Sequence, residues 1–250
     1  MIAARPYNRK LNDILDNLLA SIGDQSHELF QPHEAVRRIK VVVFSSDRGL
    51  CGSFNSSINR RLDTFMRENA SIEVELVTIG RKVRDYARRR SYKVAGENPN
   101  IPPVQFDKLA RELSLVLVRE FELERADEVH LLYNQFRSAI SQVVVIEQLL
   151  PLVQPTRAGV AEPGSLIDFV YEPSQGAILD VLLPQLVANR IMQALLESHA
   201  SEHGARMAAM DSATRNASEV IDRLTLEYNR ARQAAITKEL VEIVSGAEAL

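Results

Sequence analysis

The amino-acid sequence predicts an α/β protein made of a central domain with a doubly wound sheet and a helix that is too long to fit inside that domain. Three observations lead to this prediction. Apolar, β-branched runs alternate with amphipathic helical segments between residues 36 and 173. From residue 186 to residue 244 there is no proline and a single glycine, Gly204. Along the same stretch, apolar and small residues recur at alternating steps of four and three.

Composition and charge narrow the classes of function. The 250 residues carry a formal net charge of -3, which gives no electrostatic footprint for a nucleic-acid partner. The single cysteine, Cys51, rules out a disulfide framework within the chain and fits a reducing compartment. No apolar run approaches the roughly 18 residues of a membrane-spanning helix, and no signal-peptide pattern is present. Any association with a membrane is therefore expected to run through partner proteins.

The central domain is expected to span residues 36–173. Residues 38–45 form a nearly continuous apolar run, which is typical of a strand buried on both faces. The other expected elements are strands at 73–79, 128–133, 142–153 and 166–171, and helices at 54–69, 82–90 and 106–125. Because strands and helices alternate, we expect a parallel sheet.

Both ends of the chain are predicted to be helical. Residues 6–22 carry an apolar stripe at helical spacing, and we assign residues 1–22 to an N-terminal helix. Residues 186–244 are predicted to form one continuous helix of about 90 Å at about 1.5 Å per residue, which must leave its own domain. We assign residues 177–250 to this long C-terminal unit.

The long helix has a seam on which a second helix is expected to lie. The 3.5-residue period of the seam is that of a coiled coil. Several members are small or polar, which favours close approach over strong association, so we expect the helix to need a surrounding partner for stability. A long core helix of an ordinary bundle is the alternative. The seam consists of His203, Met207, Met210, Thr214, Ala217, Ile221, Leu224, Tyr228, Ala231 and Ala235.

The segment after the first expected strand lies where a phosphate-binding loop would lie. It reads Ser-Asp-Arg-Gly-Leu-Cys-Gly over residues 46–52, which has neither the dinucleotide-binding nor the P-loop spacing of glycines. We therefore favour a structural turn, with nucleotide binding as the alternative. Cys51 is a poor candidate for a nucleophile, because no convincing histidine and acid or amide pair is available to activate it.

Two further clusters are candidate sites. His199 and His203, with Glu202 between them, form an H-x-x-E-H pattern that places two imidazoles on one helix face. An obvious third ligand is missing, so we interpret these residues as partly solvated seam histidines. A basic cluster at residues 81–90 is interpreted as a solvated helix face, with contact to an acidic partner surface as the alternative.

Two stretches resemble a known family. Residues 45–52, Ser-Ser-Asp-Arg-Gly-Leu-Cys-Gly, followed by Asn55, look like the signature after the first strand in the γ subunit of F-type ATP synthases. The run from residue 200 to 250, including Tyr228-Asn229 and Arg232-Gln233, resembles the most characteristic segment of that family almost throughout. The resemblance extends over the whole chain, and both motifs are highly specific.

The resemblance implies a Rossmann-like central domain and a long antiparallel coiled coil formed by the N- and C-terminal helices. In that family the helix pair turns inside a hexamer of α and β subunits, and the lower part of the stalk meets the ε subunit and the c ring. The implied function is that of a non-catalytic rotor, without cofactor or metal, which couples proton-driven c-ring rotation to ATP synthesis or hydrolysis. Its implied location is peripheral, on the cytoplasmic side of a bacterial cell membrane. Competing hypotheses are a free-standing nucleotide- or metal-dependent α/β enzyme and a coiled-coil scaffold.

The resemblance also assigns roles to residues. Arg232 and Gln233 match a polar pair that contacts a β-subunit loop, with Thr237 nearby, and Tyr171 and Glu172 match the foot that faces the ε subunit and the c ring. The residues carried over as a structural motif are Asp47, Arg48, Gly49, Cys51 and Gly52.

The sequence departs from the family pattern at two places. The family normally has roughly 40 further helical residues before the position of Ala4, so we expect a truncated coiled-coil strand or a wrong start site. The cysteine-bearing insertion of the chloroplast branch is absent around residues 155–168. Redox control is therefore not expected, and a bacterial origin is favoured.

Overall fold

The computed structural model describes residues 27–153 and 175–248. Their strands form one five-stranded sheet with the order β3-β2-β1-β4-β5. The strands are β1 (Arg38–Phe44), β2 (Glu73–Ile79), β3 (Val94–Asn98), β4 (Glu128–Ser138) and β5 (Ser141–Leu150). The helices are α2 (Phe54–Glu68), α3 (Arg81–Arg89), α4 (Phe106–Glu122) and α5 (Gln175–Glu248), with 3-10 turns at Glu28–Phe30 and Pro103–Gln105.

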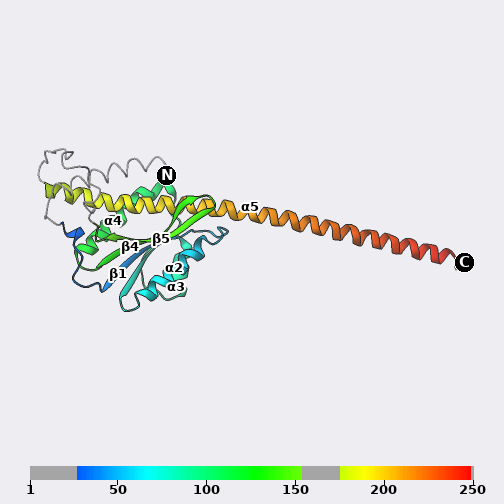
Figure 1. Ribbon diagram of the computed structural model, residues 1–250, viewed down its shortest axis with the longest axis horizontal. Helices are drawn as coiled ribbons and strands as arrows, with labels where there is room; N and C mark the ends of the chain where they lie inside the picture. The colour runs from blue at the N-terminus through cyan, green and yellow to red at the C-terminus, as the bar shows by residue number, and fades with distance from the viewer. Residues whose placement is uncertain (1–26, 154–174, 249–250) are drawn as a thin grey trace, which may run out of the picture.

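Helices cover both faces of the sheet, as the doubly wound prediction requires. Successive side chains of a strand point to opposite faces, so Val41 and Val43 of β1 join a core with α2 and α3. Val42 and Phe44 join a second core with α4 and the first part of α5. Figure 1 shows α5 running along this second face and then far beyond it. The predicted α/β class with a doubly wound sheet is confirmed.

The prediction of an entirely parallel sheet is wrong at one edge. Strands β1, β2, β3 and β4 are mutually parallel, but β5 pairs antiparallel with β4. Only Ala139 and Ile140 separate β4 from β5, and so short a connection can only form a hairpin, since a parallel pair needs a long crossover. The hairpin also makes β4 longer than the predicted strand at 128–133 and ends β5 before residue 153.

Strand β3 is not among the elements predicted from the sequence. Its sequence, Val-Ala-Gly-Glu-Asn, has no apolar run, and its burial alternates between partly buried and exposed residues because it lies at the sheet edge. The predicted helix at 6–22 and the predicted strand at 166–171 fall outside the described residues. The helices expected at 54–69, 82–90 and 106–125 are present within a few residues of those bounds.

Helix α5 has 74 residues, about 110 Å at about 1.5 Å per residue. It begins at Gln175 and passes through Pro184, so the continuous helix extends farther toward the N-terminus than the stretch predicted from residue 186. Pro184 cannot donate the usual backbone hydrogen bond, but the flanking Leu183 and Leu186 are buried in the core and hold the helix in place. Core packing therefore overrides the local cost of the proline.

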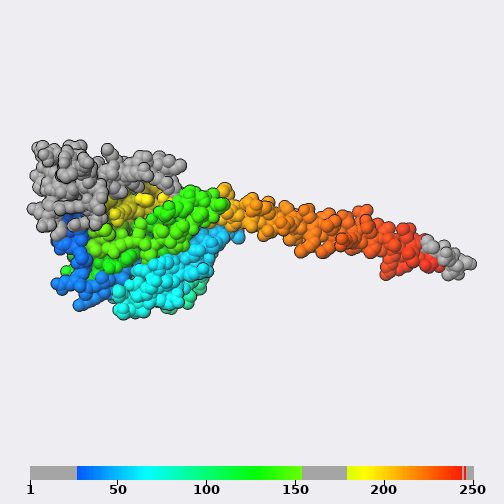
Figure 2. All heavy atoms as spheres, viewed as in Figure 1, coloured from blue at the N-terminus to red at the C-terminus, as the bar shows by residue number. Residues whose placement is uncertain are grey.

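The second half of α5 is a free shaft. Every residue from 211 to 243 is exposed. Figure 2 shows this shaft extending away from the α/β domain. Exposed apolar side chains on it include Ile221, Leu224 and Tyr228 of the predicted seam. Among the residues that the structure describes, none of the helices combines the length and the apolar character needed to span a bilayer.

Candidate functional site at the loop after strand β1

Residues 45–53 connect β1 to α2 at the carboxyl edge of the parallel strands, and we call them the signature loop. The loop starts in close contact with the end of β2. Ser45 N donates to Ile79 O at 2.8 Å, and Ser45 Oγ accepts from Val83 N at 2.9 Å. The loop is therefore fixed to the start of α3 at its first residue.

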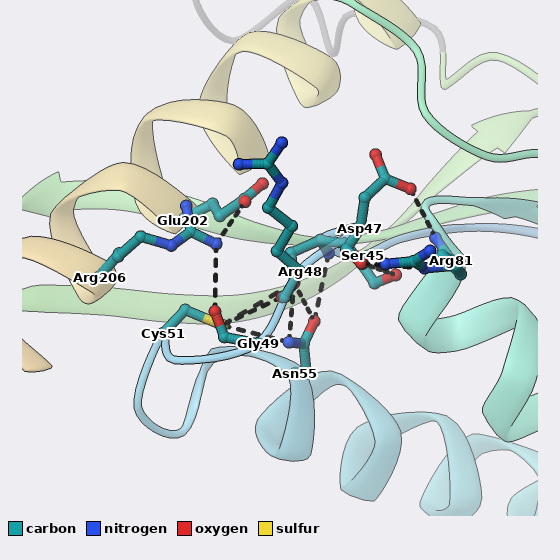
Figure 3. Close-up of polar contacts among 10 residues, drawn as sticks. Ser45, Asp47, Arg48, Gly49, Cys51, Asn55, Arg81, Glu202 and Arg206 are labelled. Atoms are coloured by element: carbon teal, nitrogen blue, oxygen red, sulfur yellow. Dashed lines mark hydrogen bonds and ion pairs between the residues drawn. The ribbon is translucent and has the colours of Figure 1, made fainter.

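Asp47 holds two further segments. Its Oδ1 accepts from Arg81 N at 2.8 Å and from Asn100 N at 2.9 Å, while Arg81 Nε donates to Asp47 O at 3.2 Å. Figure 3 shows the carboxylate of Asp47 turned toward Arg81. Arg81 N belongs to the first turn of α3, where backbone N–H groups lack helical acceptors. A carboxylate of the protein thus occupies the N-terminus of α3, which could otherwise bind an anion.

The interior of the signature loop is a polar network around Ser46, which is fully buried. Ser46 N donates to Asn55 Oδ1 at 3.1 Å, and Asn55 Nδ2 donates to Ser46 Oγ at 2.8 Å and to Cys51 Sγ at 3.1 Å. Since the serine hydroxyl has a single proton, Ser46 Oγ is left to donate to Arg48 O. The network satisfies buried polar groups within the protein, and the Cys51 thiol is a buried part of it.

The outer half of the signature loop lies against α5. Leu50 and Gly52 adopt left-handed backbone conformations, with φ of 62° and 56°, which turn the chain back toward α2. Arg206 Nη2 of α5 donates to Gly49 O at 3.5 Å and also binds Glu202 Oε1 at 2.8 Å. Cys51, Phe54 and Ala205 form a small apolar cluster at the same place. The outer half of the loop, including its cysteine, therefore serves a contact with the long helix.

A cleft of about 380 Å³ lies between the signature loop, the end of β3 and α5. Its charged lining is mixed, because Arg48 and Arg206 face it together with Asp47 and Glu202. Asp47 and Arg206 already have partners within the protein. The acidic side chains of the lining and the pairing of Arg206 with Glu202 disfavour a phosphate in this cleft, which argues against the nucleotide-binding alternative.

The histidine pair lines the same cleft. The rings of His199 and His203 are edge-to-face with centroids 4.5 Å apart, and His199 packs edge-to-face on Phe106 at 5.5 Å. Within residues 27–153 and 175–248, no group of three or more histidine, cysteine or acidic side chains is placed to hold a metal ion. His199 is half-buried and His203 is exposed, which agrees with partly solvated histidines.

The stability of the protein is expected to fall as the pH drops through the range of His199. Burial, followed by the neighbouring His203 and opposed by Glu202, lowers the pKa of His199 below its usual value near 6.5. The unfolded chain therefore takes up a proton before the folded chain does, so the stability is fully present above that value and is lost below it. Chemical denaturation at about pH 7.5 and about pH 5.5 should show this loss, and His199→Gln should reduce it. An unchanged loss in the variant would contradict the assignment.

The basic cluster lies on α3 and its C-cap, and three of its residues form ion pairs. Arg84 binds Asp85 at 2.8 Å, Arg88 binds Glu97 at 2.8 Å and Arg90 binds Asp63 at 3.0 Å. Among the described residues, Lys82 and Arg89 form no ion pair. A helix face with this many exposed ion pairs fits the predicted solvated surface, and exposed pairs of this kind contribute little to stability.

The structure does not bring all of the predicted site residues together. Arg232, Gln233 and Thr237 lie on the exposed shaft, more than 20 residues and thus over about 30 Å beyond the signature loop. Tyr171 and Glu172 fall outside the described residues. Glu197 and Ser201 of α5 were not predicted to be functional residues. Both are buried polar residues, and they differ from other polar residues of the helix only by their contacts with β4, which the sequence does not reveal.

These features define a class of protein in which an α/β domain holds one end of a long helix. The rest of the helix is an exposed shaft that partner proteins can contact. A family described as ATP synthase matches residues 1–250 of the chain. Among curated relatives, the ATP synthase gamma chain of Anaeromyxobacter sp. (strain Fw109-5) is 48% identical over 259 residues, covering 100% of this chain and 87% of the relative. That of Geobacter metallireducens is 45% identical over 252 residues, covering 100% and 86%. The chain belongs to the ATP synthase gamma-chain family, the central-stalk subunits of F-type ATP synthases.

Solved structures support the same fold. A chain of the Euglena gracilis mitochondrial ATP synthase in rotational state 3 superposes with a TM-score of 0.60 at 16% identity, covering 99% of this chain and 91% of that one. A chain of the Tetrahymena thermophila mitochondrial ATP synthase central stalk and c ring gives a TM-score of 0.56 at 24% identity, covering 85% and 96%. At these identities the likeness concerns the fold alone.

Proposed function

We propose that this chain is the rotor of a proton-driven ATP synthase and couples rotation of a c ring to ATP synthesis or hydrolysis at sites on α and β subunits. The observation that carries the proposal is the shaft, because residues 211–243 are exposed along their whole circumference. An isolated helix of this length gains little from propensity alone and is stabilised by packing against other surfaces. A surrounding hexamer and a second helix on the seam would supply that packing.

In this proposal the chain has no catalytic site of its own. Asp47 bonds to α3, and Cys51 and the Arg48 carbonyl belong to the buried network, so in this proposal the motif of Asp47, Arg48, Gly49, Cys51 and Gly52 acts in structure and not in chemistry. Asp47 caps α3, and Gly49 accepts from Arg206. Neither a cofactor nor a metal is required for such a role.

The proposed partners contact different parts of the chain. Arg232, Gln233 and Thr237 would contact a β-subunit loop. They lie on the outer part of the exposed shaft, where Gln233 and Thr237 are four residues apart and therefore on one helix face. Tyr171 and Glu172 would face an ε subunit and the c ring. Membrane association would then be peripheral and indirect, on the cytoplasmic side of a bacterial membrane.

Reconstitution tests this function directly. The chain replaces the γ subunit in an otherwise complete bacterial ATP synthase, including its stator and its proton channel, and the purified complex is placed in lipid vesicles. We expect co-purification in a stable complex and ATP hydrolysis that acidifies the vesicles. A chain that fails to co-purify with α and β subunits would refute the proposal, and so would a complex that hydrolyses ATP without moving protons.

A further inference from the structure

The attachment of α5 to the globular domain ends abruptly. Up to residue 243, Ala205 is the last buried residue of the helix, residues 206–210 are partly buried or exposed, and every residue from 211 to 243 is exposed. Within the described residues, a torque carried by the shaft therefore passes between α5 and the domain before residue 211. The contacts just before this point are the last ones between the main apolar core packing of α5, whose last buried member is Leu195, and the exposed shaft.

On one side, α5 completes the hydrogen bonding of β4. The pairing of β4 with β1 ends at Leu132, so backbone groups farther along this edge of β4 pair with none of the described strands. Ser201 Oγ donates to Asn134 O at 3.0 Å, and Glu197 Oε2 accepts from Phe136 N at 2.8 Å. Both side chains are buried, with relative exposures of 0% for Ser201 and 4% for Glu197. Breaking either bond would leave a buried polar group unsatisfied, which is costly.

The β4–β5 hairpin approaches α5 closely one turn farther along. A Cβ at Gly204 would lie 3.0 Å from Ala139 O and 3.1 Å from Ala139 Cα. Only a residue without a side chain allows this approach without a shift of the hairpin. This accounts for the single glycine in the long stretch from 186 to 244.

The signature loop contacts the same segment of α5 from another element. Arg206 reaches Gly49 O while it binds Glu202, and Ala205 packs on Cys51 and Phe54. Figure 3 shows Arg206 and Glu202 side by side on α5 above Gly49. The helix is therefore bonded over residues 197–206 to β4 and its hairpin as well as to the signature loop.

We propose that these contacts form a clamp that fixes α5 against rotation about its own axis, and that residues 197–206 are where torque passes between the domain and the shaft. If α5 contacted a single element, it could rotate about its axis while sliding along that element. Contacts with both β4 and the signature loop resist this rotation. Glu197, Ser201, Gly204 and Arg206 are positioning residues of this clamp. The proposal rests on the proposed function, because it requires that the shaft rotates under load.

The test uses the double variant Glu197→Ala with Ser201→Ala in the reconstituted complex. We expect the Phe136 amide, which donates to Glu197, to exchange its hydrogen at least about tenfold faster, as loss of a buried hydrogen bond predicts. ATP hydrolysis without a proton gradient should persist. The proton gradient that ATP hydrolysis can sustain should fall, because the clamp yields under load.

The control is Glu68→Ala with Ser56→Ala, which changes the same residue types at exposed positions of α2 whose bonds are local to that helix and its N-cap. It should alter neither the exchange of Phe136 nor the gradient. If the double variant does not fold, Glu197→Ala alone gives the same readouts, because it removes only the bond that Phe136 N donates. Faster exchange with an undiminished gradient would overturn the clamp, whereas failure of the unmodified chain to couple would overturn only the proposed function.

Discussion

Replacing Gly80 by alanine is expected to lower the free energy of unfolding by at least about 3 kcal/mol, or to prevent folding of the α/β domain. A Cβ at this position would lie 2.1 Å from Ser45 O and 2.7 Å from Ser45 C, and the backbone has a φ of 94°. Both obstacles are backbone atoms, which cannot rotate away as a side chain can. Moving Ser45 would break its bonds to Ile79 O and Val83 N. Chemical denaturation followed by circular dichroism measures the loss.

Gly49→Ala is the matched control for this prediction. Gly49 lies in the signature loop that Gly80 contacts, but a Cβ added at Gly49 would have no atom within 4 Å, and its φ is not in the left-handed region. Its substitution should change the free energy of unfolding by less than about 1 kcal/mol. Equal denaturation midpoints for the two variants would show that the approach of Gly80 to Ser45 is not needed for stability.

Arg232→Ala with Gln233→Ala is expected to reduce ATP turnover of the assembled complex by at least about tenfold, which corresponds to about 1.4 kcal/mol. Both residues are exposed, and within the described chain neither forms a hydrogen bond or an ion pair through its side chain. Exposed substitutions on a helix change folding stability by about 0.5 kcal/mol or less. A loss of turnover would therefore arise at a contact with a partner subunit. The measurement is steady-state ATP hydrolysis of the purified complex.

Lys238→Ala serves as the control for the shaft. It removes a cation from another face of α5, where Lys238 lies 3.7 Å from Glu242 within the same helix. Turnover should change much less than in the Arg232 and Gln233 variant. A simple coiled-coil scaffold predicts no effect from either substitution, so equal turnover in both variants and the unmodified complex would support that competing hypothesis.

Much of the fold could be predicted because its signals are local. Strand β1 is an apolar run, α4 carries a helical stripe, and the shaft is indicated by the absence of proline and by one glycine in a long stretch. The spacing of residues 46–52 already argued against a nucleotide-binding motif. These features depend on residues that are neighbours in the sequence, so the sequence by itself determined them.

The tertiary structure decided the features that depend on distant residues. The strand character of β3 comes from pairing with β2 at the sheet edge, and the start of α5 before Pro184 comes from core packing. The contact between Arg206 and Gly49 joins residues 157 positions apart, and that between Ser201 and Asn134 joins residues 67 apart. No periodicity or motif in the sequence indicates such pairs. Their hydrogen bonds stabilise the protein only once folding has brought the two polar groups together away from water.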